Sequence, residues 1–153
     1  MQYWMIVNQP VVARFCAERG VGRVFVDLEA LGKQQRQGHL DTWMSSHQPG
    51  DVALVRPAVG VGQLLVRLNP WHQGSPEEID AALGSGADWL MLPMFRHLHE
   101  LQAFCGAVAG RVPVIPLVET AEAFALLPEV IRVDGVGEVF IGLNDLRLSL
   151  GLS

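Results

Sequence analysis

Cysteine is scarce in this sequence. Two cysteines, Cys16 and Cys105, stand far apart among 153 residues, and neither belongs to a Cys-x-x-Cys pair. A disulfide framework needs more cysteines and a structural zinc site needs them clustered, so neither kind of site is expected. Each cysteine falls on an apolar helical stripe, which favours a packing role.

Positive charge and long apolar runs are also in short supply. The chain has 11 lysines and arginines against 16 aspartates and glutamates, which gives a net charge of -5. Nucleic-acid binding needs a basic face, so nucleic acid is not expected as a partner. The apolar runs are far shorter than the roughly 18 residues that cross a membrane. The first residues lack the basic start of a secretory signal, so we expect a soluble, cytoplasmic protein without membrane contact.

Half of the residues are apolar, which is enough for a sizeable core in a single domain spanning 1–153. Uninterrupted apolar runs, rather than alternating ones, are typical of strands buried on both faces of a parallel sheet. The last four of six such runs are centred 25 residues apart, which fits one strand and one helix per unit. The six runs cover 5–7, 24–26, 64–66, 89–92, 112–118 and 139–141.

Helix signals fill the gaps between these runs. Ser75 precedes Pro76, with Glu78 three residues later, so we predict that Ser75 caps a helix beginning at Pro76. Apolar stripes predict further helices within 11–16, 98–108 and 121–131, with a possible kink at Pro128 in the last one. The longer gap between the second and third runs predicts two helical pieces, 36–46 and 51–59.

Consecutive strand–helix units without hairpin turns restrict the topology. Right-handed crossovers build either a doubly wound sheet or part of an eight-stranded α/β barrel. No Gly-x-Gly-x-x-Gly follows the first run, which weakens the dinucleotide-binding version of the sheet. Charged residues gather after the runs, and α/β barrels place their chemistry at the carboxyl ends of their strands.

Glu119 and Asp145 follow the fifth and sixth runs, so their carboxylates are expected to converge. Two carboxylates with water suit Mg²⁺ or Mn²⁺, which prefer oxygen ligands. The alternative is that they cap the following helices, with Asp145 capping a helix that begins at Leu146. The spacing leaves both interpretations open.

Arg67 follows the third run, and its guanidinium is suited to a bidentate clamp on a substrate carboxylate. An ion pair with Asp27 or Glu29, at the end of the second run, is the alternative, and the two interpretations are compatible. Among the five histidines, His39 is best placed as an acid/base candidate, because it lies nearest the end of the second run. The serines lack the context of a nucleophile elbow.

Five segments at the strand ends form an ordered pattern; they are 26–29 (Val-Asp-Leu-Glu), 65–69 (Leu-Val-Arg-Leu-Asn), 86–93, 116–120 (Pro-Leu-Val-Glu-Thr) and 141–151. In this order they resemble the HpcH/HpaI aldolase and citrate lyase family. The resemblance runs over nearly the whole chain and implies a pyruvate-type α/β barrel of the (β/α)8 class, of which this chain supplies about six β/α units.

The resemblance implies that Glu119 and Asp145 hold a divalent metal, usually Mg²⁺. It implies that Arg67 is catalytic and contacts the carboxylate or enolate oxygen of a pyruvate-like oxo acid, with Asp27 and Glu29 also at the substrate. The expected reaction is metal-dependent carbon–carbon bond cleavage through a metal-stabilised enolate. Two alternatives are an acyl-CoA lyase of the citrate lyase or malyl-CoA lyase type, and an inactive member that acts only as a binding or assembly module.

Two departures from the family pattern bear on these expectations. The family's aldolases carry a histidine after the acidic pair of the second strand, where this chain has Ala30. His39 is a speculative substitute for that histidine. Family barrels have eight strands and about 250 residues, whereas six runs are present here. We therefore expect strands seven and eight to be lacking, and the chain to form a homo-oligomer or to be completed by another chain.

Overall fold

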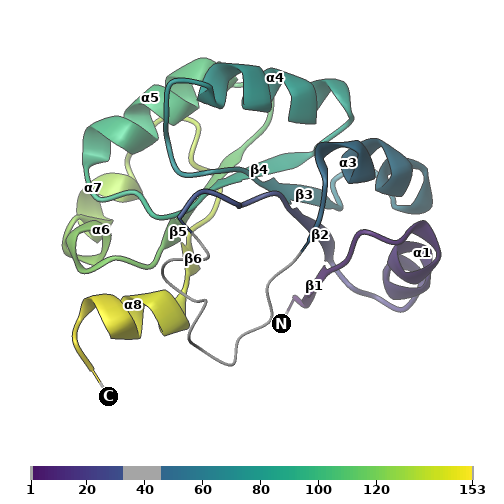
Figure 1. The fold of residues 1–153 in the computed structure, drawn as a ribbon, viewed down its shortest axis with the longest axis horizontal. Helices are drawn as coiled ribbons and strands as arrows, with labels where there is room; N and C mark the ends of the chain where they lie inside the picture. The colour runs from purple at the N-terminus through teal and green to yellow at the C-terminus, as the bar shows by residue number, and fades with distance from the viewer. Residues whose placement is uncertain (1, 33–45, 153) are drawn as a thin grey trace.

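The computed structural model describes residues 2–32 and 46–152. Within them, six strands form one parallel sheet in the order β1-β2-β3-β4-β5-β6, so each strand lies beside its neighbour in the sequence (Figure 1). All six predicted runs are strands, which confirms the parallel α/β architecture. The strands are β1 (Trp4–Ile6), β2 (Arg23–Asp27), β3 (Leu64–Arg67), β4 (Trp89–Leu92), β5 (Val114–Val118) and β6 (Phe140–Ile141).

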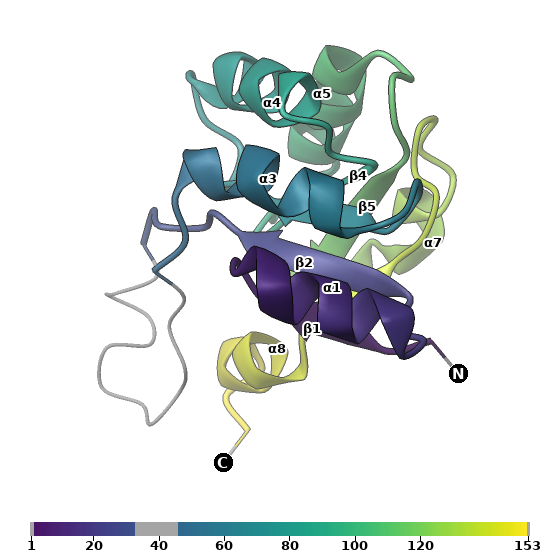
Figure 2. The same cartoon turned by 90° about the vertical axis from the view of Figure 1, so that its right-hand side faces the viewer.

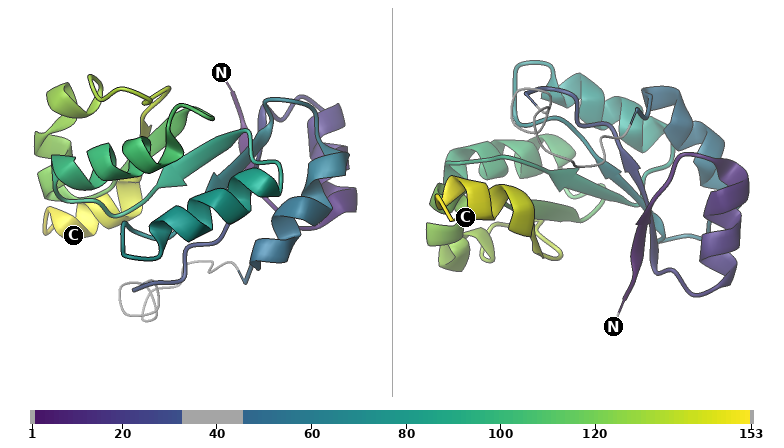
Figure 3. Two further views of the ribbon diagram at one scale, coloured as in Figure 1. Left: turned by 90° about the horizontal axis from the view of Figure 1, so that it is seen from above. Right: turned by 60° about the horizontal axis from the view of Figure 1, so that its bottom comes forward.

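Helices cover the outer face of the curled sheet in an arc from α1 to α6, as Figure 1 shows, and α8 follows β6. Figure 2 shows α1 and α3 side by side over β2, and both views of Figure 3 show the twist of the sheet. The helices are α1 (Pro10–Glu18), α3 (Pro49–Val55), α4 (Ser75–Gly84), α5 (Leu98–Val108), α6 (Ala121–Ala125), α7 (Leu127–Val130) and α8 (Leu143–Ser149), with a short 3-10 turn at Arg56–Ala58.

Alternation along the strands divides the core into two layers. In β3, Leu64 and Val66 pack against the helices, whereas Leu65 packs on the inner side of the curl. Among the described residues, the inner layer consists of strand side chains; its buried members are Phe25, Leu65, Met91, Ile115 and Leu117. Successive strand side chains point to opposite faces, so residues two positions further along share the inner face. The result is an incomplete α/β barrel with a filled interior.

Two local predictions are wrong in detail, and one alternative is excluded. Ser75 is the first residue of α4 and Gly74 is its N-cap; the Ser75 hydroxyl instead accepts a hydrogen bond from the His72 N–H at 2.9 Å. The segment predicted as one kinked helix over 121–131 is two helices that meet at Leu126. Asp145 does not cap a helix, because α8 begins at Leu143 and Asp145 lies inside its first turn.

At the amino ends of the strands, side chains from β1 and β6 meet although their backbones do not pair. The rings of Trp4 and Phe140 stack with centroids 4.8 Å apart. The buried Arg23 donates two hydrogen bonds of 2.6 Å to the Glu138 carboxylate, and its guanidinium lies 3.9 Å from the centre of the Trp89 ring. This ion pair and aromatic cluster hold the curl together at the end opposite the predicted site.

The end strands leave apolar surface exposed. Met5 and Ile6 of β1 are 46% and 44% exposed, and Phe140 and Ile141 of β6 are 39% and 37% exposed. Within the described residues, β1 pairs only with β2 and β6 only with β5. None of the described helices has the length and apolar character needed to cross a bilayer.

Candidate functional site

At the carboxyl ends of β2, β3 and β5, the side chains that face the inside of the curled sheet are polar. Phe25 is inner, so Asp27, two residues on, shares its face; in the same way Arg67 follows Leu65 and Glu119 follows Leu117. Asp27 and Arg67 are also direct partners in the register of β2 and β3. The fold therefore delivers these polar groups to one rim above an apolar floor, as the sequence predicts.

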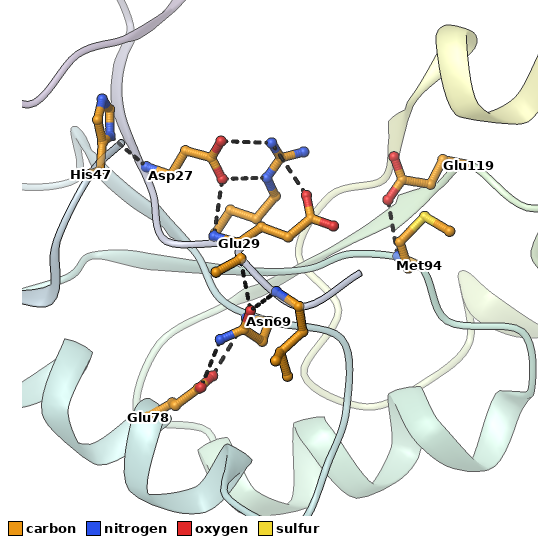
Figure 4. A network of polar contacts seen from close by, with 10 residues as sticks. Asp27, Glu29, His47, Asn69, Glu78, Met94 and Glu119 are labelled. Atoms are coloured by element: carbon orange, nitrogen blue, oxygen red, sulfur yellow. Dashed lines mark hydrogen bonds and ion pairs between the residues drawn. The ribbon is translucent and has the colours of Figure 1, made fainter. Parts of the chain in front are cut away.

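Arg67 is held by two carboxylates. Its Nε and Nη2 donate to Asp27 Oδ1 and Oδ2 at 2.8 and 2.9 Å, and Glu29 Oε2 lies 3.5 Å from Nη2. Burial by itself would lower the pKa of Arg67, but its hydrogen bond to Asp27 and the charges of Asp27, Glu29 and Glu119 raise that pKa above its ordinary value. The ion-pair interpretation of Arg67 is confirmed, and both of its predicted partners take part (Figure 4).

Glu119 is almost fully buried, at 3% exposure, directly after β5. Its Oε1 accepts a 2.9 Å hydrogen bond from the Met94 N–H. Met94 holds a left-handed backbone with φ of 54°, which is uncommon for a residue with a side chain and aims this N–H at the carboxylate. The polypeptide also passes very close to Glu119 at Gly142, where an added Cβ would lie 2.8 Å from the Glu119 Cβ.

The pKa of Glu119 is raised to about 8. Burial is the largest cause, and the negative charges of Glu29 and Asp145 add to it, while Arg67 and the Met94 N–H act in the opposite direction. The acidic neighbours of this carboxyl group thus act against the charge of Arg67.

Asp145 lies in the first turn of α8 and its charge reaches Glu119. No cluster of three or more His, Cys, Asp or Glu side chains suited to a metal ion is found in 2–32 and 46–152. Two carboxylates are nevertheless an adequate protein contribution for Mg²⁺, which keeps several waters and uses one or two carboxylates. The oxygen donors of Glu119 and Asp145 are of the kind that a hard divalent cation prefers.

A second polar group fixes the chain after β2. Asn69 Oδ1 accepts hydrogen bonds from the N–H groups of Ala30 and Leu31, each at 2.9 Å, and Asn69 Nδ2 donates to Glu78 Oε1 at 2.7 Å. Asn69 belongs to the 65–69 segment at the end of the third apolar run. Its contact with Glu78 of α4 is not predicted by any local pattern. Figure 4 shows Asn69 between Glu78 and this part of the chain.

The histidine predicted as an acid/base group, His39, lies outside the described residues. His47, for which no sequence pattern predicts a role, accepts a hydrogen bond at its Nδ1 from the Asp27 N–H at 3.0 Å. That hydrogen bond places His47 beside the backbone of Asp27. In Figure 4, it lies on the far side of Asp27 from Glu119.

A cavity of about 470 Å³ lies behind this rim, between α3 and α4. Its lining includes His47, Asn69 and Glu78, so it borders the group that fixes the chain after β2. A larger hollow of about 740 Å³ lies between α5 and α7 and contains none of the rim carboxylates. Neither cavity is lined by Arg67 or Glu119, so neither coincides with the rim itself.

Solved structures share this fold. Citrate synthase SbnG aligns with 99% of this chain at a TM-score of 0.73 and 17% identity, over 64% of its own length. An HpcH/HpaI aldolase/citrate lyase family protein from Burkholderia cenocepacia aligns with 98% at a TM-score of 0.74 and 20% identity, over 66% of its length. The citrate lyase β subunit from M. tuberculosis, in complex with oxaloacetate and magnesium, aligns with 99% at 0.68 and 21%, over 61% of its length.

This chain thus spans less than two thirds of the length of these structures. No curated protein matches the sequence. The family model described as HpcH/HpaI aldolase/citrate lyase matches residues 2–153, which is nearly the whole chain. The chain belongs to the HpcH/HpaI aldolase/citrate lyase family.

Proposed function

We propose that this chain carries the binding residues of a metal-dependent carbon–carbon lyase that acts on a pyruvate-like oxo acid. The observation that carries the proposal is the juxtaposition of Arg67 with the buried Glu119 at one rim, each close enough to shift the pKa of the other. Family membership supports the same class of reaction, and the M. tuberculosis citrate lyase β subunit is complexed with oxaloacetate and magnesium.

In this proposal Glu119 and Asp145 hold a divalent cation, Mg²⁺ or Mn²⁺. A bound cation supplies a Lewis acid at the carbonyl oxygen on which negative charge develops. Arg67 orients the substrate carboxylate with its guanidinium, which Asp27 and Glu29 keep in place from one side. The apolar floor of Phe25 and Leu65 excludes water from below and strengthens these electrostatic interactions.

Exchange of the methyl protons of pyruvate with deuterium tests the proposal, because it reports enolate formation without a known second substrate. Wild-type protein with Mg²⁺ is expected to catalyse the exchange and to lose it with chelator. Arg67→Lys keeps the charge but loses the planar fork, so we expect at least about a tenfold slower exchange. Wild-type exchange rates in this variant would contradict the role of Arg67.

The cation is tested separately by titration calorimetry with Mg²⁺. Glu119→Ala and Asp145→Ala are each expected to lose measurable affinity while keeping the circular dichroism of the fold. Asp80→Ala, which removes an exposed acid on α4, is the control. Metal binding without proton exchange would favour the binding-module alternative, and cleavage of acyl-CoA thioesters in place of oxo acids would favour the acyl-CoA lyase alternative.

A further inference from the structure

The hydrogen bonds of Asn69 link α4 to the chain that carries the acidic residues of the rim. Asn69 stands two residues after Arg67, and its side chain turns toward the segment that follows β2. Its Oδ1 accepts from two consecutive backbone N–H groups, those of Ala30 and Leu31. These two residues immediately follow Glu29, so Asn69 fixes the backbone directly after Glu29 by hydrogen bonding.

The orientation of the Asn69 amide follows from its partners. Its Nδ2 donates to Glu78 Oε1 at 2.7 Å, and a carboxylate accepts hydrogen bonds only, so the amide nitrogen must face Glu78. The oxygen then faces the two N–H donors. A flipped amide would set oxygen against carboxylate and nitrogen against N–H, and all three hydrogen bonds would be lost.

Glu78 is itself fixed. It lies in the first turn of α4, where the helix dipole favours negative charge. His72 Nδ1 accepts a hydrogen bond from the Gly74 N–H at 3.1 Å, so in the neutral ring Nε2 carries the proton and donates to Glu78 Oε1 at 3.1 Å. Glu78 therefore accepts from both His72 and Asn69.

The segment held by Asn69 is anchored at its other end by Asp27. Asp27 Oδ1 accepts from Arg67 Nε at 2.8 Å and from the Glu29 N–H at 3.2 Å. Glu29 lies between these two anchors, 5% exposed, with its carboxylate 3.5 Å from Arg67 and its charge acting on Glu119. Two fixed ends leave the Glu29 backbone little freedom.

We infer that Asn69, oriented by Glu78, is a positioning residue that sets the place of Glu29 and, through it, the geometry of Arg67. This inference deepens the proposed function and rests on it for its consequence at the substrate. The structural part of the inference, that Asn69 fixes the chain after β2, does not depend on the proposed function and is measured separately.

Amide hydrogen exchange of Ala30 and Leu31, measured by NMR on the full chain, tests the hold directly. Asn69→Ala removes the shared acceptor, and we expect both amides to exchange about fivefold faster, because a hydrogen bond contributes on the order of 1 kcal/mol. Glu78→Ala should also speed exchange at these amides, whereas Glu78→Gln keeps an acceptor for Asn69 Nδ2 and should stay close to wild type. Rescue by the glutamine is not expected if Glu78 matters only through its charge.

Asp88→Asn is the control, because it disturbs the Arg56 pair at the amino ends of β3 and β4 and should leave exchange at Ala30 and Leu31 unchanged. Wild-type exchange in Asn69→Ala would overturn the inference. If that variant does not fold, equal exchange in Glu78→Ala and Glu78→Gln would overturn it instead.

Binding of pyruvate in the presence of Mg²⁺ gives the consequence at the site. Asn69→Ala is expected to weaken pyruvate binding at least about tenfold by calorimetry, because Glu29, one of the two carboxylates beside Arg67, is then no longer fixed. Faster exchange together with unchanged pyruvate affinity would overturn the link to Arg67. Wild-type protein that binds no pyruvate would contradict the proposed function. The amide exchange result would then decide whether Asn69 fixes the backbone at Ala30 and Leu31.

Discussion

The buried Glu119 carboxyl group, with its raised pKa, makes the stability of the fold depend on pH. Its pKa is about 8 in the folded protein against an ordinary value of 4.5. The folded state therefore holds this proton more tightly than the unfolded state does. As pH rises from 4.5 toward 8, the free energy of unfolding falls, and the full cost is present above pH 8.

Glu119→Gln removes this ionisation and keeps the shape of the side chain. Without divalent cations, we expect the variant to melt at a higher temperature than wild type at pH 9, with a stabilisation on the order of a few kcal/mol. At pH 5 the two proteins should melt at similar temperatures. Thermal denaturation at the two pH values checks this.

The control for that measurement is Glu77→Gln on the exposed side of α4. It should leave the difference between pH 5 and pH 9 as in wild type. A wild-type protein whose melting temperature does not decline between these pH values, relative to Glu119→Gln, would show that Glu119 ionises normally.

Gly142 is required for a close approach rather than for an unusual φ. A Cβ at this position would lie 2.8 Å from the Glu119 Cβ and 2.9 Å from its Oε2. Gly142→Ala should therefore displace the Glu119 carboxylate, destabilise the fold by about 1–3 kcal/mol and weaken Mg²⁺ binding. Urea denaturation and calorimetry measure the two effects.

Gly106→Ala in α5 is the matched control, because a Cβ there meets no atom within 4 Å. This change should be neutral or stabilising, by up to about 1 kcal/mol, as alanine is favoured over glycine inside a helix. Equal effects of the two substitutions would mean that Glu119 moves aside without cost.

At the scale of elements, the strands could be predicted and several helix ends could not. Each strand is a short apolar run, and the central strands β2 to β5 are buried almost throughout, so the signal is local in the sequence. The start of α4 was predicted one residue late because the Ser75 hydroxyl bonds the His72 N–H, a turn contact that competes with capping. Asp145 looked like a cap because it directly precedes the expected helix start at Leu146, but α8 begins three residues earlier, at Leu143.

The residues of the candidate site also fall into those that could be predicted from the sequence and those that could not. Arg67, Glu119 and Asp27 could be placed on one rim because strand ends and a two-residue alternation decide their positions. Asn69 and Glu78 meet across β3 and α4, and the contact of His47 with Asp27 joins residues 20 positions apart. Contacts of this kind depend on how the elements pack, which single-sequence patterns do not contain.

The Arg23–Glu138 pair joins β2 to the strand end before β6. Arg23 is 4% exposed and Glu138 40%, so removal of Glu138 leaves a buried guanidinium without its carboxylate. Glu138→Ala should cost about 2–4 kcal/mol, less than for a fully buried pair because water reaches Glu138. Asp80→Ala breaks the exposed pair with Arg111 and should cost less than about 1 kcal/mol.

Urea denaturation of the two variants compares these costs. The difference should be largest at neutral pH and should shrink in acid, because Arg23 lowers the pKa of Glu138 and the stabilisation is lost as pH falls through that lowered value. Similar costs for the two variants at neutral pH would show that the pair at the amino end does not hold the curl.

At the scale of the whole molecule, the sheet ends in two strands that are apolar and paired on one side only. Among the described residues, the outer edges of β1 and β6 have no strand partner. An unpaired edge offers backbone N–H and C=O groups to another chain, and exposed apolar side chains add to the attraction. The Trp4 and Phe140 rings bring the two edges together at their amino ends.

We therefore expect the 153-residue chain to self-associate, with an apparent mass by light scattering above 16.7 kDa that rises with concentration. Ile6→Lys places a charge on the β1 edge and should shift the distribution toward monomer, as charged residues do on natural edge strands. Val61→Lys, at a position that is 97% exposed in the turn before β3, is the matched control and should associate like wild type. A monodisperse monomer at high concentration that binds no apolar-surface dye would show instead that the inner layer and the amino-end cluster suffice to close the six strands on themselves.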